Sequence, residues 1–209
     1  MPLRFCACAG ALALLLVIPS GAAEAQRAAH GPPDWPCVQR LIPELGAGSI
    51  WAGPPIDELD MEWWEDEEVA RVVRFATARE TPVPEALERV NAFIETVEED
   101  ELETRLTLLF AGLFREINQE RSRTIEAVRR YARGQVGRLE RISGLVDELE
   151  QLRGSNGAEP AAIERLEQEL FWERRLFHDR QTAMRALCSQ PYILEERLGR
   201  FVGTIHARL

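Results

Sequence analysis

Residues 99–153 decide the fold, and they read EDELETRLTLLFAGLFREINQERSRTIEAVRRYARGQVGRLERISGLVDELEQLR. The stretch contains no proline, and its acidic start suits the positive end of a helix dipole. Its apolar residues recur at spacings of three and four, which is the pattern of a helix with one buried face. We therefore expect one long helix. Its predicted buried positions are Leu102, Leu106, Leu109, Leu113, Ile117, Ile125, Val128, Ala132, Leu139, Ile142, Val146 and Leu149.

A polar belt, residues 118–124, divides this helix into two halves. Arg121 stands in the belt at a position that the apolar pattern would bury. The half before the belt is strongly apolar, and we expect it to belong to a packed cluster. The half after it is weaker and contains three glycines, each of which costs about 1 kcal/mol relative to alanine in a helix. We expect this second half to project from the cluster.

A second helical stretch, residues 160–209, is expected to fold back on the first. Residues 154–157 read GSNG, a turn signal, and Pro160 suits the first turn of the returning helix. A hairpin centred between Asn156 and Gly157 pairs residues whose numbers sum to about 313. This register predicts three pairs, namely Ile142 with Phe171, Ile125 with Cys188, and Gly112 with Phe201. The SQP triplet at 189–191 is expected to start a separate last helix.

Two shorter helices are expected before the long one. Residues 57–79 carry an apolar face that includes Met61 and Trp64, with Asp57 as the expected N-cap. Residues 85–97 should form the second short helix after a stiff turn at 82–84. The predicted fold class is all-α. It consists of a long antiparallel helical hairpin, coiled-coil-like, with two shorter N-terminal helices forming a small bundle at one end and the hairpin tip near 154–159.

Residues 1–25 resemble a secretory leader. Arg4 gives a positive start, residues 9–18 form an apolar core, and Ala23-Glu24-Ala25 fits the cleavage rule, so we expect a cut before Gln26. Ten apolar residues are too few for the roughly 20 that span a bilayer. The expected location is the bacterial periplasm, with no stable membrane insertion after cleavage of the leader.

Residues 26–56 are rich in proline and glycine, which excludes a long helix. The segment nevertheless carries Trp35 and Trp51, so we interpret it as an extended strap lying on the helices. The alternative is that the two tryptophans line a ligand pocket. Two cysteines remain after the leader, Cys37 and Cys188, and in an exported protein such a pair is expected to form a disulfide.

The composition argues against several classes of function. The net charge is −10, which disfavours nucleic acid or an anionic membrane surface as the main partner. All 25 basic residues are arginine, so mechanisms that need lysine are excluded. The three histidines stand in none of the common metal-binding motifs, and the few serines lack a nucleophile motif. We expect no enzyme activity, no cofactor and no metal.

The charge distribution suggests an interaction surface instead. One candidate set is basic and the other is acidic, and either could contact another protein or a second copy. The sets are Arg121, Arg123, Arg129, Arg130 and Arg133, and Glu65, Asp66, Glu67 and Glu68. The leading hypothesis is a non-catalytic interaction module or accessory subunit. The alternatives are a periplasmic chaperone or stress sensor, and an accessory protein that binds a metal or cofactor.

Overall fold

The computed structural model describes residues 32–157 and 159–209 of the 209-residue chain. In that part of the chain every regular element is helical, so the all-α prediction is confirmed. The elements are the 3-10 helices Ala47–Ser49 (η1) and Ile56–Glu58 (η2) and the α-helices Glu67–Thr77 (α1), Val83–Thr96 (α2), Leu102–Gly154 (α3) and Pro160–His206 (α4). The expected leader, residues 1–25, lies outside the described residues.

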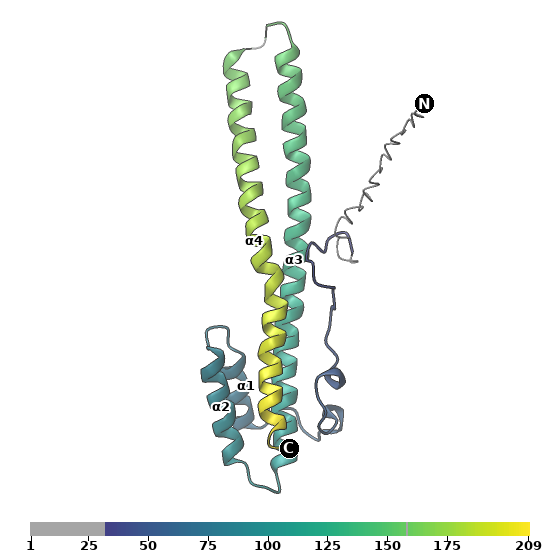
Figure 1. Ribbon diagram of the computed structural model, residues 1–209, viewed down its shortest axis with the longest axis vertical. Coiled ribbons are helices and arrows are strands. Elements are labelled where there is room, and N and C mark those ends of the chain that lie inside the picture. The colour runs from purple at the N-terminus through teal and green to yellow at the C-terminus, as the bar shows by residue number, and fades with distance from the viewer. Residues whose placement is uncertain (1–31, 158) are drawn as a thin grey trace, which may run out of the picture.

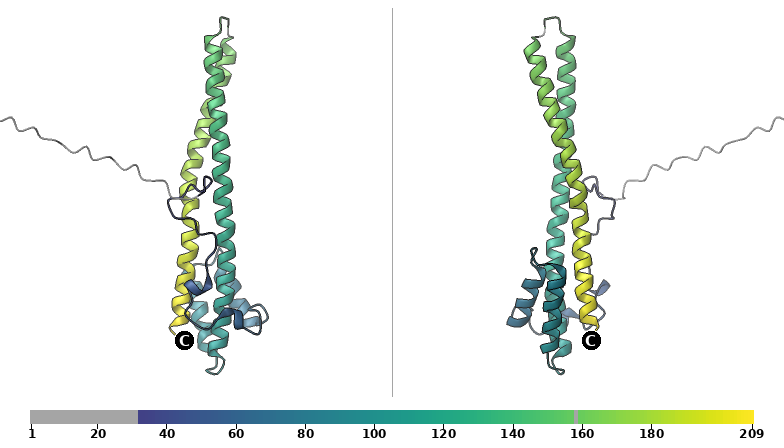
Figure 2. Two further views of the ribbon diagram at one scale, coloured as in Figure 1. Left: turned by 90° about the vertical axis from the view of Figure 1, so that its right-hand side faces the viewer. Right: turned by 60° about the vertical axis from the view of Figure 1, so that its left-hand side comes forward.

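The two long helices, α3 and α4, lie side by side along an elongated molecule (Figure 1, Figure 2). The predicted stretch 99–153 is indeed one helix, which begins at Leu102 and ends at Gly154. The two helices run in opposite directions, because residue 121 of α3 meets residue 195 of α4 while residue 135 meets residue 177. A coiled-coil supercoil for this pair stays a prediction.

The prediction of a separate last helix starting at residues 189–191 is wrong, because α4 continues through Pro191. An interior proline removes one backbone hydrogen bond and costs about 3 kcal/mol. Packing on both sides offsets that cost: Cys188 is bonded to the strap, and Leu198 is fully buried in the core. Pro191 itself is buried.

A cluster at one end of the rod contains most of the core. Helices α1 and α2 pack there against α3 and α4, as predicted (Figure 1). The five expected positions from Leu102 to Ile117 are all buried. Arg197 of α4 donates hydrogen bonds to the carbonyls of Ala76, Ala78 and Thr81, which satisfies backbone acceptors at the C-terminal end of α1. Burial lowers the pKa of Arg197.

The start of α1 differs from the prediction. The helix begins at Glu67 rather than near Asp57, because the Asp66 side chain accepts hydrogen bonds from the backbone N–H groups of Glu68 and Val69. Residues 59–66 form turns before this cap. The change of geometry buries Trp63 and leaves Trp64, which was expected on the apolar face, partly exposed.

Gly112 does not face Phe201 in the way the hairpin register predicted. A Cβ at Gly112 would lie 2.7 Å from a methyl carbon of Val73 and 3.0 Å from the Trp63 ring. Because Gly112 has no side chain, α1 and the turn before it can pack closely against α3 at this position. Phe201 is fully buried elsewhere in the same core.

The outer half of the helix pair has a smaller apolar seam, formed by Leu145, Leu149, Leu166 and Leu170. The predicted buried position Leu139 is wrong, since 54% of its surface is exposed. A straight helix drifts by about 20° per heptad from a strict seven-residue repeat, and Leu145 is buried instead. On α4, Leu170 keeps the three-and-four apolar spacing and is buried, whereas Phe171 beside it is 59% exposed. In the described part of the chain, no helix is both long and apolar enough to cross a membrane.

Candidate interaction surface

The strap, residues 32–56, runs along the helix pair from its middle toward the cluster (Figure 1). Cys37 and Cys188 stand at disulfide distance, as predicted, with their Cα atoms 5.5 Å apart. Trp35 and Cys37 are buried against Ile125 and Val128 of α3. The Trp35 indole donates a hydrogen bond to the carbonyl of Gln39 at 2.7 Å. Trp35 is thus a buried anchor of the strap, in agreement with the interpretation of this segment as a strap lying on the helices.

Asp34 fixes the strap through charge. Its Oδ2 atom accepts hydrogen bonds from Arg129 at 3.0 Å and from Arg133 at 2.5 Å. The hydrogen bond from Arg129 lowers the pKa of Asp34, and the bond from Arg133 and both positive charges outweigh the opposing effect of desolvation. The same bond raises the pKa of Arg129. An acidic residue in a turn of the strap is therefore held by two arginines on one flank of α3.

The polar belt 118–124 of α3 forms hydrogen bonds with both the strap and α4. The Asn118 side chain accepts a hydrogen bond from the backbone N–H of Leu45 at 3.1 Å. Arg121 is buried, and it donates to Glu195 of α4 at 2.5 Å and to the carbonyl of Pro43 at 3.2 Å. The belt is hence a layer of satisfied polar contacts between three segments.

A cleft of about 670 Å³ opens beside the disulfide, between the strap and the two long helices. Pro36, Cys37 and Val38 form its strap side. Val136 of α3 and Phe177 of α4 form the opposite walls. The walls are largely apolar, and 89% of Val38 and 57% of Val136 are exposed.

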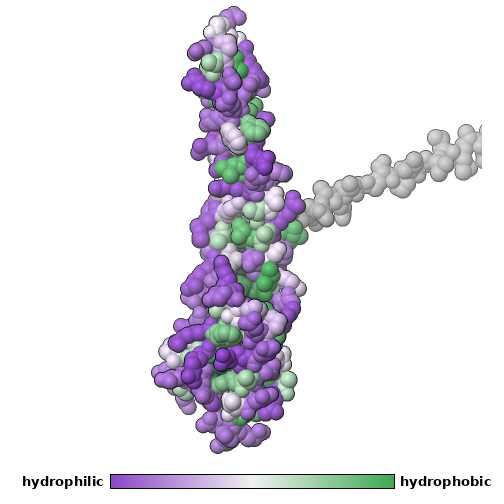
Figure 3. Space-filling model, turned by 90° about the vertical axis from the view of Figure 1, so that its left-hand side faces the viewer, coloured by the Kyte–Doolittle hydropathy of each residue, from purple (hydrophilic) through white to green (hydrophobic). Residues whose placement is uncertain are grey.

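The seam between the helices is polar next to this cleft. Gln135 of α3 donates to the backbone carbonyl of Phe177, and Arg138 forms an ion pair with Glu173. Polar residues occupy the seam here, so the apolar side chains Val136 and Leu139 stand on its flank and in solvent. Figure 3 shows the result on one face, where apolar patches alternate with hydrophilic surface along the rod.

A second cleft of about 650 Å³ lies farther toward the tip. Val146 and Leu149 of α3 and Phe171 of α4 supply its apolar surface. The charged groups around it are Glu150, Arg153, Glu167, Arg174 and Arg175, and His178 also lines it. Arg153 is paired with Glu167, and Arg175 with Asp179.

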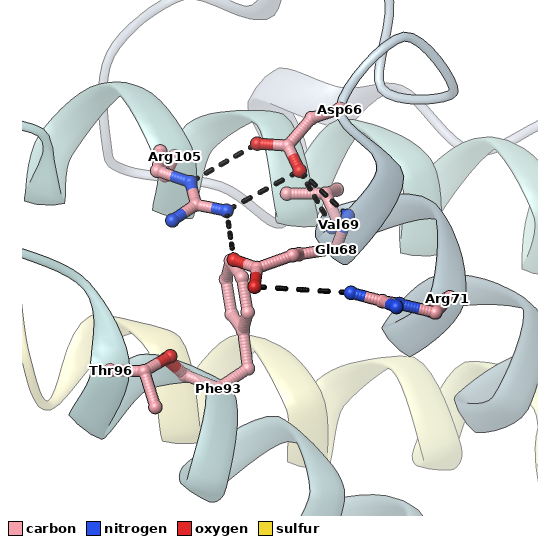
Figure 4. A network of polar contacts seen from close by, with 7 residues as sticks. All are labelled: Asp66, Glu68, Val69, Arg71, Phe93, Thr96 and Arg105. Carbon is pink, nitrogen blue, oxygen red and sulfur yellow. Dashed lines mark hydrogen bonds and ion pairs between the residues drawn. The ribbon is translucent and has the colours of Figure 1, made fainter.

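The acidic candidate set is partly used inside the cluster (Figure 4). Arg105 pairs with Asp66 at 3.1 Å and with Glu68 at 2.8 Å, and its guanidinium lies 5.0 Å from the Phe93 ring centre. Burial opposes ionisation of Asp66, but hydrogen bonds from the Val69 N–H and from Arg105 outweigh it and lower the pKa. Glu65 accepts a hydrogen bond from the backbone N–H of Glu62.

The basic candidate set is also largely engaged within the chain. Arg121, Arg129 and Arg133 bind α4 and the strap, as described above, and Arg123 pairs with Glu120. Arg130 forms no ion pair with any residue that the structure describes. A role for the two sets in binding another protein stays a prediction.

Sequence reasoning missed the outer flank of the helix pair as a surface. Phe171 and Trp172 are adjacent, with rings packed edge to face at 5.2 Å, yet both are mostly exposed. Two consecutive aromatic residues cannot both face one helical seam, because successive residues point about 100° apart. The Phe171-Trp172 doublet is therefore the feature of the sequence that could have indicated an exposed apolar surface here.

Among the described residues, no group of three or more His, Cys, Asp or Glu side chains is arranged to hold a metal ion. The comparisons with family models, with curated proteins and with solved structures each found no match.

Proposed function

We propose that this protein is an exported, non-catalytic interaction module or accessory subunit of the bacterial periplasm. Its working surface is the stalk, which we define as residues 134–154 of α3 and 160–178 of α4. The stalk extends beyond the cluster that contains α1 and α2, so a partner can reach it without displacing the core (Figure 1).

One observation carries this proposal: the stalk exposes large apolar side chains that the described part of the chain does not cover. Exposure reaches 59% for Phe171 and 57% for Val136. Covering such a side chain contributes about 1.5–3 kcal/mol. A partner that covers several of them gains enough to offset part of the cost of association. The affected residues are Val136, Leu139, Phe171 and Leu176.

Export is supported by the leader pattern of residues 1–25 and by the disulfide. Disulfides persist in oxidising compartments such as the periplasm and are rare in the cytosol. The Cys37–Cys188 pair joins the strap to α4 across 151 positions of sequence, which suits a structural role.

A periplasmic chaperone is the second candidate, and the same exposed apolar residues favour it. A chaperone would hold many different unfolded clients weakly, whereas an accessory subunit would hold one partner in a fixed ratio.

Affinity purification of the tagged protein from periplasm, with quantitative mass spectrometry, separates the two. A single co-purifying protein at a constant ratio is the expected result. Suppression of client aggregation in light scattering, without such a partner, would favour the chaperone. Failure of both would contradict the proposal.

A further inference from the structure

The two clefts lie along the same flank of the helix pair, and together with the surface between them we call them the groove. Val136, Leu139 and Val146 follow each other at spacings of three and seven along α3, so they share a face. Phe171, Arg174, His178 and Arg185 do the same on α4 at spacings of three, four and seven. Members of both stripes line both clefts. The groove therefore runs from the disulfide to the tip of the stalk.

The strap shows which chemistry this flank accepts. Next to the inner cleft the proline-rich strap lies against α3, with Trp35 and Cys37 buried against Ile125 and Val128. Its carboxylate, Asp34, is held by Arg129 and Arg133. The contacts combine apolar side chains with an acid held by arginine.

The rest of the groove offers the same combination. Val146, Leu149 and Phe171 provide the apolar surface of the outer cleft. Its lining has three arginines and two glutamates, but Arg153 is paired with Glu167 and Arg175 with Asp179, which leaves Arg174 and Glu150 without an ion pair in the described part of the chain. Arg174 and Arg185 form no ion pair with any residue in the described part of the chain. An incoming carboxylate would thus meet cations at both ends of the groove.

We propose that this groove binds an extended segment of a partner protein in which apolar side chains alternate with carboxylates. This inference rests on the proposed function and names the partner's chemistry. From Val136 to Arg153 the groove covers 17 positions of α3, or roughly 25 Å at 1.5 Å per residue. An extended chain of about eight residues spans that length. The segment would continue the path of the strap toward the tip.

Three labelled ten-residue peptides test the required chemistry. The first alternates Leu or Trp with Asp or Glu around one proline. In the second, lysine replaces the acids, and in the third, serine replaces the apolar residues. Fluorescence anisotropy with the full mature chain, disulfide intact, should show saturable binding of the first peptide at least about tenfold tighter than that of the others. Added salt should weaken it, because exposed charges are screened. Equal binding of all three peptides would overturn the inference.

Matched variants locate the binding site. Phe171→Ser and Arg174→Glu should each weaken the acidic peptide by about tenfold, the effect of losing roughly 1.4 kcal/mol. The controls are Trp172→Ser, an adjacent and more exposed aromatic outside both clefts, and Arg165→Glu, an exposed arginine on the same helix. Circular dichroism must show that all four variants stay helical. Loss of binding in the controls as large as in the groove variants would contradict the assignment.

Two further results separate this inference from the proposed function. If no peptide binds but a periplasmic partner is lost on Phe171→Ser, the inference fails while the interaction role stands. If the acidic peptide binds but no partner co-purifies, the inference is supported and the proposed function is contradicted. Sedimentation equilibrium tests whether a second copy of the chain occupies the groove instead. A dimer that dissociates on Phe171→Ser would show that it does and would overturn the inference.

Discussion

Single residues fix where the segments of this protein meet. Gly112 allows Val73 and Trp63 to touch α3, and Arg121 joins the strap to α4. The sequence pattern correctly placed Arg121 at a buried position. It could not identify the partners of Arg121, because Glu195 and Pro43 are more than 70 positions away and their approach depends on the folded chain.

Gly112→Ala should destabilise the protein by about 1–2 kcal/mol, because overpacking outweighs the gain in helix propensity. The added Cβ would come within 2.7 Å of Val73. Thermal unfolding should show a fall of about 2–8 °C in Tm. Gly134→Ala is the matched control in the same helix, since open space surrounds that position. An equal rise in stability for both variants would mean that α1 does not pack tightly on Gly112.

Asp34 should make attachment of the strap sensitive to acid. Its pKa is lowered in the folded protein, so its contribution to stability is complete above the unfolded value of about 3.9 and is lost as pH falls through the folded pKa. At pH 7, Asp34→Asn should lower Tm by about 1–4 °C. The difference between the variant and the natural chain should shrink as the pH falls below about 3.9 and the Asp34 carboxylate becomes protonated. Asp179→Asn, in an exposed pair with Arg175, is the control and should change Tm little. A difference that persists unchanged at low pH would contradict this account of Asp34.

Whole helices were predictable from the sequence where a strong apolar periodicity, or a residue that disfavours helix, marked their extent. The proline-free stretch 99–153 became α3 with nearly the expected ends. The start of α1 was not predictable in the same way, because Asp57 and Asp66 are both acceptable caps and the burial of Trp63 decides between them. Pro191 led to the wrong prediction of a helix break, because the surrounding packing offsets the backbone cost of a proline within α4.

The disulfide should matter more to the strap than to the long helices. It closes a loop of 151 positions, which contributes up to about 5 kcal/mol through the unfolded chain. A Cys37→Ser, Cys188→Ser double variant should lower Tm and speed proteolysis between residues 32 and 46. Far-UV circular dichroism below the unfolding transition should stay helical. Proteolysis of the strap at the rate of the natural chain would show that Trp35 and Asp34 hold it without the bond.

The molecule as a whole combines a well-packed end with a thinly packed rod. The cluster buries more than twenty apolar residues, whereas the stalk seam rests on four leucines with three partly buried neighbours. This difference was predictable, because the apolar pattern weakens after the polar belt. The groove was not, since it arises from seam positions that the expected register placed inside. Leu139, which the expected register placed inside, is exposed, and Gln135, Arg138 and Glu173 occupy the seam near it. Phe171 stands beside the buried Leu170 and faces outward.

The central claim is that the groove flank of the stalk binds a partner protein. The most direct measurement is the molar ratio of the co-purified periplasmic partner for three forms: the natural chain, a Leu139→Ser, Phe171→Ser variant, and Trp172→Ser. We predict a constant ratio for the natural chain and for Trp172→Ser, and a loss of at least about tenfold for the groove variant. The same ratio in all three forms would contradict the claim.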